Sequence, residues 1–471
     1  MSEPSSRDVA NQKLVLVVTT LGSFMTPFDS SATTLAIPLI GADFGGGLIL
    51  LSWISIAYLV ALTTFLLVFG RIGDIRGRRI LLLTGVLVFT FASVISGLSI
   101  SLYQLIFARL VQGIGTSMMS GNSMAFLTSV LPSSERGKAI GIVTGATYAG
   151  LSLGPVIGGF LISQFGWRSI FYINVPIGLV AAYLCYFKTY ETQCFDKKSS
   201  FDALGAASLT TSIFSILASI TLSQAGFLSS EYLSSLVTLG VLSFLLFCYT
   251  EKELSAQPLI DMRLFAENRM FALSNVTAFL NYLSSFGIGF LLSLYLQAVL
   301  RLDPNQAGLI MLSQPILMTA VSPLSGRLSD RIQPKVLVSI GLAIMSICML
   351  VLSSVTADTS PYALVLILAT LGLGYGLFSS PNTSAVMGSV SKGSLGVGSS
   401  TLSTMRFLGQ SLSMVLVAFI LTSSVSYNIV LIGRGQLNVS VQDFLLGFSI
   451  SLRICAIIAA TAVVSSLWRG S

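Results

Sequence analysis

The segment Gly-Arg-Ile-Gly-Asp at residues 70–74 ends one long apolar run, and Gly-Arg-Leu-Ser-Asp at residues 326–330 ends another. The two segments are 326 − 70 = 256 residues apart, and the same offset places Gly137 opposite Gly393 in a second pair of basic loops. Two matches at one offset are improbable by chance and indicate an internal repeat. The chain is therefore predicted to consist of two halves built on one plan.

Composition predicts a membrane protein. Of the 471 residues, 54% are hydrophobic and only 9% are charged, which is far too apolar for a soluble chain. A helix that crosses a bilayer needs about 20 apolar residues. We predict fourteen such helices, at roughly residues 14–40, 50–69, 80–99, 102–127, 137–162, 169–188, 203–222, 232–250, 270–298, 306–325, 335–355, 361–388, 393–421 and 444–467.

The distribution of positive charge predicts the orientation. Most of the 25 lysines and arginines fall in alternate loops on one side, among them Arg76, Lys138 and Arg469. Cytoplasmic loops carry such an excess, so both termini are expected in the cytoplasm and the chain in the cell membrane. Topology and anionic lipids account for the net charge of +7, and no nucleic-acid partner is needed. We expect the protein to function as a monomer.

Several kinds of chemistry are disfavoured by the residues present. The chain has no histidine, and its five cysteines form no CxxC pair, which excludes the usual zinc sites and argues against a disulfide framework. It has no P-loop and no recognisable pairing of a nucleophile with a base. We expect no enzyme activity and no cofactor, with a proton gradient as the source of energy.

The segment Gly70–Arg79 resembles the signature of the major facilitator superfamily. Three further segments resemble its drug:proton antiporter branch: Phe28–Pro38, Arg109–Gly115 and Gly150–Gly159. Together with fourteen helices, they make the chain similar to the EmrB/QacA-type subfamily. The resemblance implies an all-α polytopic fold in which two six-helix bundles, related by pseudo-twofold symmetry, rock about a central cavity. We place the bundles at residues 1–190 and 269–471, with two extra central helices in the linker at 191–268.

The resemblance also implies two conformational gates. In the helix at 137–162, small residues at four-residue spacing leave a smooth stripe, and Pro155 bends the helix; the glycines are Gly141, Gly145, Gly150, Gly154 and Gly158. This stripe is expected at the interface between the bundles, the alternative being ordinary tight packing.

The second gate is the loop that begins at Gly70. Asp74 can accept hydrogen bonds from arginines such as Arg78 and Arg79 and so hold the cytoplasmic side closed. Asp330, after Gly326, is expected to act likewise in the second half. The alternative is a solvated loop that only sets topology.

Proton coupling is expected at Asp29. Of the eighteen acidic residues, only this one is placed well inside a predicted helix, where a carboxylate is costly unless it is paired, hydrated or protonated. Arg109 is the expected partner, and with no histidine in the chain no imidazole can carry the proton instead. The alternatives are that Asp29 caps a helix broken at Pro27 and that Arg109 forms a purely structural ion pair.

The second half differs in its charges. The 256-residue offset aligns Arg406 with Gly150 and Gln410 with Gly154. Arg109, Arg406 and Arg453 against one aspartate leave the membrane interior net positive, which favours monovalent, neutral or anionic amphiphiles as cargo. The expected cavity residues are Met25, Tyr58, Gln112, Asn122, Tyr148, Asn281, Gln314, Tyr375, Asn382, Arg406 and Gln410.

Together these features predict a proton-coupled antiporter that exports hydrophobic or amphiphilic small molecules by alternating access. The alternative is a proton-coupled carrier for one endogenous metabolite or lipid, which would share the fold. The sequence does not separate the two.

Overall fold

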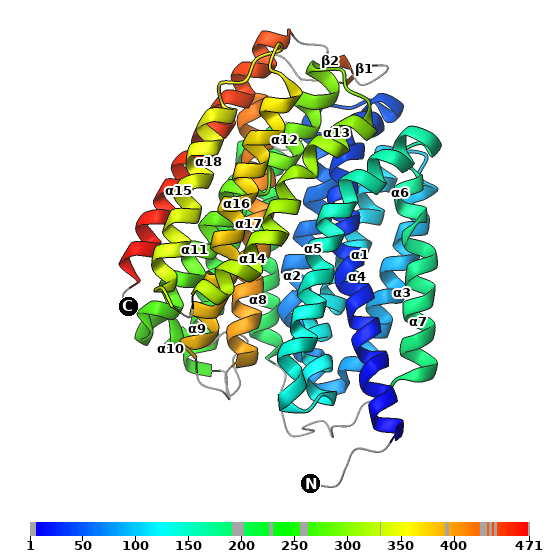
Figure 1. Ribbon diagram of the computed structural model, residues 1–471, viewed down its shortest axis with the longest axis vertical. Coiled ribbons are helices and arrows are strands. Elements are labelled where there is room, and N and C mark those ends of the chain that lie inside the picture. Colours follow the sequence, from blue (N-terminus) through cyan, green and yellow to red (C-terminus); the bar gives the residue numbers. More distant parts are fainter. Residues whose placement is uncertain are drawn as a thin grey trace.

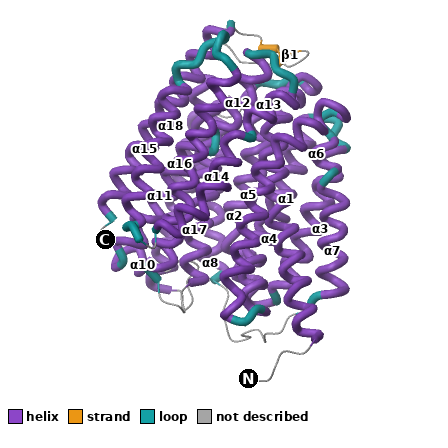
Figure 2. Tube along the Cα trace, in the orientation of Figure 1, coloured by secondary structure: helices purple, strands orange, loops and turns teal. Residues whose placement is uncertain are grey.

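The computed structural model describes residues 6–190, 202–225, 229–254, 262–329, 331–390, 395–423, 431–432, 436–437 and 440–469. These residues form long helices that run roughly along the longest axis of the molecule (Figures 1 and 2).

The helices follow the predicted order. The first group is α1 (Ser6–Phe44), α2 (Leu48–Arg76), α3 (Arg78–Gly97), α4 (Leu102–Val130), α5 (Ser133–Phe165), α6 (Ser169–Tyr172) and α7 (Asn174–Lys188). Next come α8 (Ala203–Ala225), α9 (Ser230–Tyr249), the π-helical turn η1 (Thr250–Leu254) and α10 (Met262–Glu267). The last group is α11 (Arg269–Ser285), α12 (Ile288–Leu294), the π-helical turn η2 (Tyr295–Val299), α13 (Pro304–Met311), α14 (Ser313–Leu328), α15 (Pro334–Leu352), α16 (Pro361–Gly388), α17 (Leu395–Ser423), the strand pair β1 (Leu431–Ile432) and β2 (Gln436–Leu437), and α18 (Val441–Trp468).

Eleven helical segments of the described chain are long and apolar enough to cross a bilayer. Every predicted span overlaps a helix, but the span at 270–298 is divided into α11, α12 and η2, and the span at 306–325 into α13 and α14. The helices α1, α4 and α8 fall outside the eleven. In α1 and α4 polar residues lower the mean hydropathy, so a count of fourteen crossings stays a prediction.

The two halves pack in the same way. In the first, α1 packs on α5, while α2 and α3 both pack on α4. In the second, α11 packs on α17, while α14 and α15 both pack on α16. Figure 1 shows the two groups side by side, with α8 against α2 of the first half and α17 of the second. The repeat in the sequence is thus a repeat of helix packing.

Close backbone approaches give the residue-by-residue correspondence. A Cβ on Gly113 would lie 2.3 Å from the Tyr58 carbonyl oxygen, and one on Gly372 would lie 2.1 Å from the Gln314 carbonyl oxygen. Each pair joins equivalent helices, α4 to α2 and α16 to α14. Only glycine lets the two backbones come this close.

The same comparison corrects the alignment of Arg406 and Gln410. Gly150 of α5 faces the carbonyl oxygen of Phe24, and Gly409 of α17 faces that of Phe279. Gly409 therefore corresponds to Gly150, an offset of 409 − 150 = 259, and Arg406 corresponds to Thr147. The offset grows after α15 because the connection at residues 353–360 is longer than its counterpart at 98–101.

The glycines of α5 lie on two faces, which corrects the expectation of one stripe. Gly150, Gly154 and Gly158 pack on Phe24, Phe28, Ser31 and Ala32 of α1, within the first half. Gly159 packs on Pro304, and the Pro155 carbonyl lies against Gly308, so this other face meets α13 of the second half. The predicted interface between the halves involves Pro155 and Gly159, whereas Gly150, Gly154 and Gly158 hold α5 to α1.

We predict that Gly113→Ala and Gly372→Ala each lower the thermal stability of the purified protein, because the new methyl group would force two helix backbones apart. Overpacking of this kind typically costs about 1–3 kcal/mol. Gly141→Ala is the matched control, since no described atom lies within 4 Å of the added group. Melting followed by size-exclusion chromatography measures all three, and equal melting temperatures would contradict the prediction.

Candidate functional site

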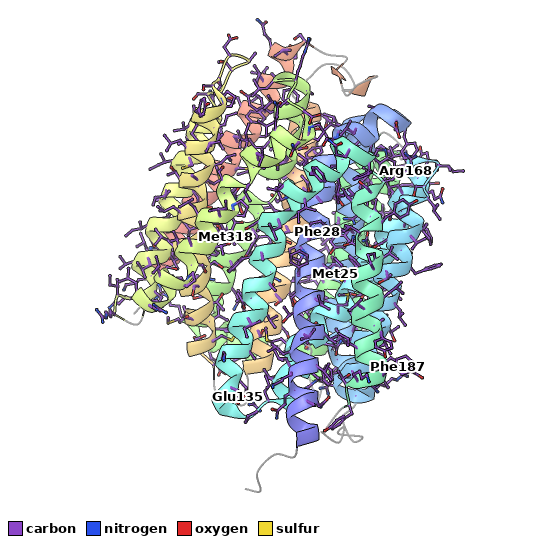
Figure 3. The ribbon with its side chains drawn as sticks, turned by 45° about the vertical axis from the view of Figure 1, so that its right-hand side comes forward. Met25, Phe28, Glu135, Arg168, Phe187 and Met318 are labelled. Atoms are coloured by element: carbon purple, nitrogen blue, oxygen red, sulfur yellow. The ribbon has the colours of Figure 1, made fainter. Side chains whose placement is uncertain are left out.

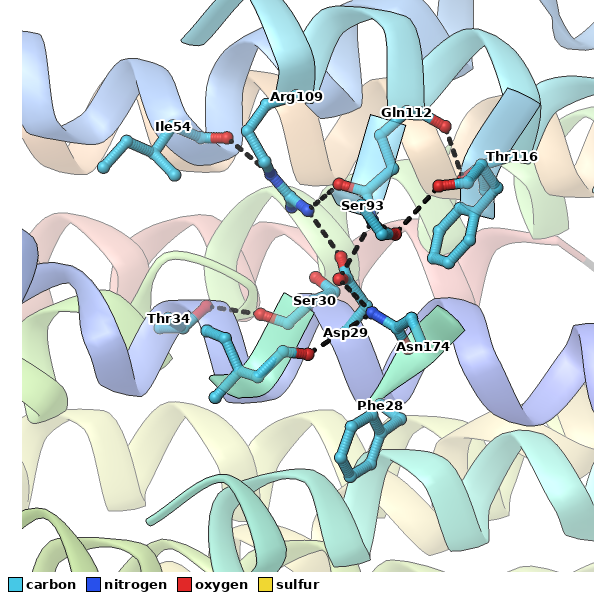
Figure 4. A network of polar contacts seen from close by, with 12 residues as sticks. Phe28, Asp29, Ser30, Thr34, Ile54, Ser93, Arg109, Gln112, Thr116 and Asn174 are labelled. Atoms are coloured by element: carbon cyan, nitrogen blue, oxygen red, sulfur yellow. Dashed lines mark hydrogen bonds and ion pairs between the residues drawn. The ribbon is translucent and has the colours of Figure 1, made fainter. Parts of the chain in front are cut away.

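The centre of the first half contains a buried ion pair. Asp29 of α1 and Arg109 of α4 are each 1% exposed, and Arg109 Nη1 donates to Asp29 Oδ2 at 2.5 Å. Figure 4 shows the contacts around this pair. The partnership expected from the sequence is present, although the role of the pair in coupling is not tested by its geometry.

The other carboxylate oxygen of Asp29 is also saturated. Oδ1 accepts from Gln112 Nε2 at 3.0 Å and from Asn174 Nδ2 at 2.8 Å. The carboxylate therefore accepts three hydrogen bonds from nitrogen donors on α4 and α7, which is the environment that an ionised acid requires in an apolar interior.

Arg109 has further partners. Its Nε donates to the Ile54 carbonyl at 3.1 Å, and Nη1 also donates to Gln112 Oε1 at 2.6 Å. The guanidinium carbon lies 4.4 Å from the centre of the Tyr58 ring and 5.8 Å from that of Phe171. Aromatic faces stabilise a cation in a dry site.

Gln112 connects the pair to a third helix. Its Nε2 donates to Ser93 Oγ of α3 at 3.0 Å as well as to Asp29. Sequence reasoning placed Gln112 and Tyr58 on a cavity wall, and in the structure both surround the ion pair. It missed Ser93 and Asn174, whose only signal is a polar side chain inside an apolar run.

The helix that carries Asp29 is continuous. α1 runs from Ser6 to Phe44 with Pro27 and Pro38 inside it, and Met25 and Phe28 lie about midway along it in Figure 3. Asp29 therefore does not cap a helix that breaks at Pro27, which removes one of the two structural alternatives.

Contacts between the halves are unevenly distributed along α5. Tyr148 Oη and Ser379 Oγ of α16 are 2.7 Å apart, and the contacts of Pro155 and Gly159 with α13 lie further toward the end of α5 that precedes Arg168. Gly141 and Gly145 share the face of Tyr148, yet no described atom lies within 4 Å of a Cβ built on either. Along this face the halves meet at the distal end and separate toward the end that begins at Ser133.

Two other helices join the halves at similar levels. Thr63 Oγ1 of α2 and Ser411 Oγ of α17 are 3.1 Å apart. Gln297 Nε2 donates to the Leu35 carbonyl of α1 at 2.8 Å. These are neutral hydrogen bonds, which contribute only about 0.5–1.5 kcal/mol each.

The predicted latch lies within the first half. Arg78 donates to Asp74 at 2.7 and 2.9 Å and to the Ala125 carbonyl at 3.2 Å, while Arg79 donates to the carbonyls of Cys185 and Tyr186. Gly70 lies near the backbone of Gly121, and Gly326 faces Ser380. Asp330 lies outside the described residues. None of the hydrogen bonds found for Asp74, Arg78 or Arg79 reaches the described residues of the second half.

The remaining cavity candidates divide into two sets. Asn122 donates to the carbonyls of Phe69 and Met118, so it joins α4 to α2 and does not face the second half. Met25 and Asn281 are fully buried, and the Gln314 carbonyl lies against Gly372. Tyr148, Tyr375, Arg406 and Gln410 are near the contact between the halves, on α5, α16 and α17.

Arg469 corrects a second expectation. The sequence placed it in a solvated loop, but it is 2% exposed and donates to Asn382 Oδ1 at 2.8 Å and Ser274 Oγ at 3.2 Å. It follows directly after α18, which packs on α11, so its side chain stays inside the bundle. Asn382 therefore binds an arginine of its own half.

The profile of the Major Facilitator Superfamily matches residues 19–414 and 275–469. The chain belongs to this superfamily. It is 32% identical to the riboflavin transporter RibZ of Clostridioides difficile over 88% of this chain and 89% of that protein. It is 31% identical to the multidrug resistance protein Stp of Mycobacterium tuberculosis over 88% and 77% of the two chains.

The fold agrees with this membership. A D-xylose-proton symporter superposes with a TM-score of 0.70 at 14% identity, covering 98% of both chains. The expected fold class and superfamily are confirmed. The protein is thus a multi-pass membrane protein from a superfamily of small-molecule transporters, in agreement with the expectation that it is not an enzyme.

We predict that Arg109→Gln lowers stability sharply, because it leaves the Asp29 carboxylate buried without its counter-ion. Breaking a buried pair costs about 3–5 kcal/mol. Adding Asn at position 29 removes the stranded charge and should restore part of the loss. The control is Arg168→Gln, which breaks an exposed pair with Asp43 worth at most about 1 kcal/mol. Denaturant unfolding in detergent measures each variant, and equal losses for Arg109→Gln and Arg168→Gln would contradict the prediction.

Proposed function

We propose that the protein is a proton-coupled antiporter that exports hydrophobic or amphiphilic small molecules by alternating access. The observation that carries this proposal is the buried pair of Asp29 and Arg109, whose charges cancel only while Asp29 is ionised. Buried ionisable residues in membrane helices mark ion and proton pathways.

Protonation of Asp29 would change the charge of the site. The pair passes from neutral to a net charge of +1, and a cation without its counter-ion is unfavourable in an apolar interior. The carboxyl group also gains a donor where three donors now point at it, so at least one hydrogen bond must break. The proton therefore favours a rearranged site.

The rearrangement has a route to the second half. Asp29 and Leu35 lie on the same helix, and the Leu35 carbonyl accepts from Gln297. The glycine face of α5 packs on α1, and the other face of α5 touches α13. A shift of α1 that follows protonation would change both contacts between the halves. Cargo leaves on one side as the proton binds, and new cargo enters on the other after the proton leaves.

A carrier for a single metabolite is the second candidate. The relative named as a riboflavin transporter favours it, whereas the relatives named as multidrug proteins favour a broader exporter. Both use the same coupling site. A panel of structurally unrelated compounds separates them, because an exporter of broad range releases protons from purified protein on binding several of them.

We predict that Asp29→Asn abolishes substrate accumulation driven by a pH gradient in proteoliposomes, because the variant cannot exchange a proton at this position. Passive exchange of substrate should persist. The matched control is Asp43→Asn on the same helix, where the side chain is 51% exposed and accepts from Trp167 and Arg168 near the end of α1. Wild-type accumulation by Asp29→Asn would remove the proposed coupling site.

We also predict that Gly145→Leu leaves folding intact but strongly reduces transport. The added side chain has open space in this conformation, yet it would obstruct the second half if the halves close over this face of α5. Ile142→Phe is the control, since it adds bulk to an exposed side chain on another face. Transport rate normalised to folded protein is the measurement, and an unimpaired rate in Gly145→Leu would show that this face stays open throughout the cycle.

A further inference from the structure

Arg406 of α17 is a cation that the first half does not neutralise. It forms no ion pair with any carboxylate among the described residues, and its Nε is buried without a hydrogen-bond partner. Its guanidinium carbon lies 4.5 Å from the centre of the Phe407 ring, and the group lies next to the Tyr282 hydroxyl. An uncompensated guanidinium inside a membrane protein is costly and indicates a function.

Tyrosines from three other helices gather near this cation. The rings of Tyr282 on α11 and Tyr375 on α16 have centres 6.2 Å apart, and the Tyr375 hydroxyl lies 2.5 Å from Ser285 Oγ. Tyr148 of α5 interacts electrostatically with Tyr282, and its hydroxyl lies 2.7 Å from Ser379 Oγ. We name Tyr148, Tyr282, Tyr375 and Arg406 the Arg406 cluster.

The Arg406 cluster lies where the halves meet. Tyr148 belongs to the first half and the other three residues to the second, so motion of the halves separates its members. Five residues after Arg406, Ser411 lies 3.1 Å from Thr63 of the first half. A ligand in this position would contact both halves, as cargo must during alternating access.

A structural role does not account for this arginine as well. Arg78, Arg109 and Arg168 each pair with a carboxylate and also donate to a backbone carbonyl. Arg406 has no such pair in the described chain. Its position corresponds to Thr147 in the first half, so the repeated plan does not require a cation there.

We propose that the Arg406 cluster is a subsite for an anionic aromatic amphiphile, with the acidic group on the Arg406 guanidinium and the flat ring against the tyrosines. Guanidinium groups bind carboxylates and sulfonates through paired N–H donors, and aromatic rings pack in offset or edge contacts. This inference rests on the proposed exporter function, because it names the chemical class of the cargo.

The test uses two probes with one ring system. Anilinonaphthalene sulfonate carries an acidic group, and phenylnaphthylamine is its uncharged counterpart. Equilibrium dialysis compares their binding to the full-length protein in phosphatidylcholine nanodiscs, after subtraction of binding to empty nanodiscs. We expect the wild type to bind the sulfonate about tenfold or more tightly than the neutral probe, the usual range for a hydrogen bond between charged groups.

Variants assign the effect to Arg406. Arg406→Gln should weaken sulfonate binding by about tenfold or more and leave the neutral probe unchanged, while Arg406→Lys should retain part of the difference. Arg453→Gln, which removes an exposed arginine of α18, should change neither probe. Equal binding of the two probes by the wild type, which needs no variant to fold, would overturn the proposal. So would an equal loss of both probes in Arg406→Gln.

These outcomes are independent of the coupling test. If the sulfonate preference is present but Asp29→Asn accumulates substrate like the wild type, the subsite stands and the coupling proposal fails. If Asp29→Asn loses accumulation but the wild type does not prefer the sulfonate, only the subsite fails.

Discussion

The pairing of Asp29 with Arg109 is the interaction on which the first half depends. Two charges removed from water are tolerated only when their opposite signs and their hydrogen-bonding groups are satisfied together. Here that requirement brings α1, α2, α3, α4 and α7 to one point, through side chains or a carbonyl from each. The same requirement makes the site sensitive to one proton. A pair that is stable because its charges cancel becomes unstable when one of them is removed.

The second half repeats the backbone plan without this chemistry. The glycine contacts that align the halves place Ser284 where the first half has Asp29, and Leu368 where it has Arg109. Duplication of the fold thus kept the close helix packing that glycine permits, because any side chain there would separate the backbones. It did not keep the charges. The two intramembrane charges that cancel lie in one half, and an uncompensated cation, Arg406, lies in the other.

The sequence predicted the features whose physical cause is local. Long apolar runs predict the helices, and the expense of a buried carboxylate singles out Asp29 and makes Arg109 its partner. Helix rotation depends on packing that the sequence does not display, so Gln112 and Asn122 were assigned to a cavity although they bind groups of their own half. The alignment of Arg406 with Gly150 was wrong because a longer connection between α15 and α16 shifts the register. Arg469 was misplaced because a residue just beyond a helix can still pack inside the bundle.

The strengths of the contacts separate what moves from what does not. Within the first half, the charged pair and the close approaches of Gly150 and Gly113 are costly to disrupt, since any change exposes a buried charge or a packed backbone. Between the halves, the described contacts are neutral hydrogen bonds such as Tyr148 with Ser379 and close backbone contacts at the distal end of α5. Neutral hydrogen bonds can be exchanged for others at little net cost. The halves are therefore expected to move as rigid bodies, and α5 can hold α1 with one face while its other face separates from the second half.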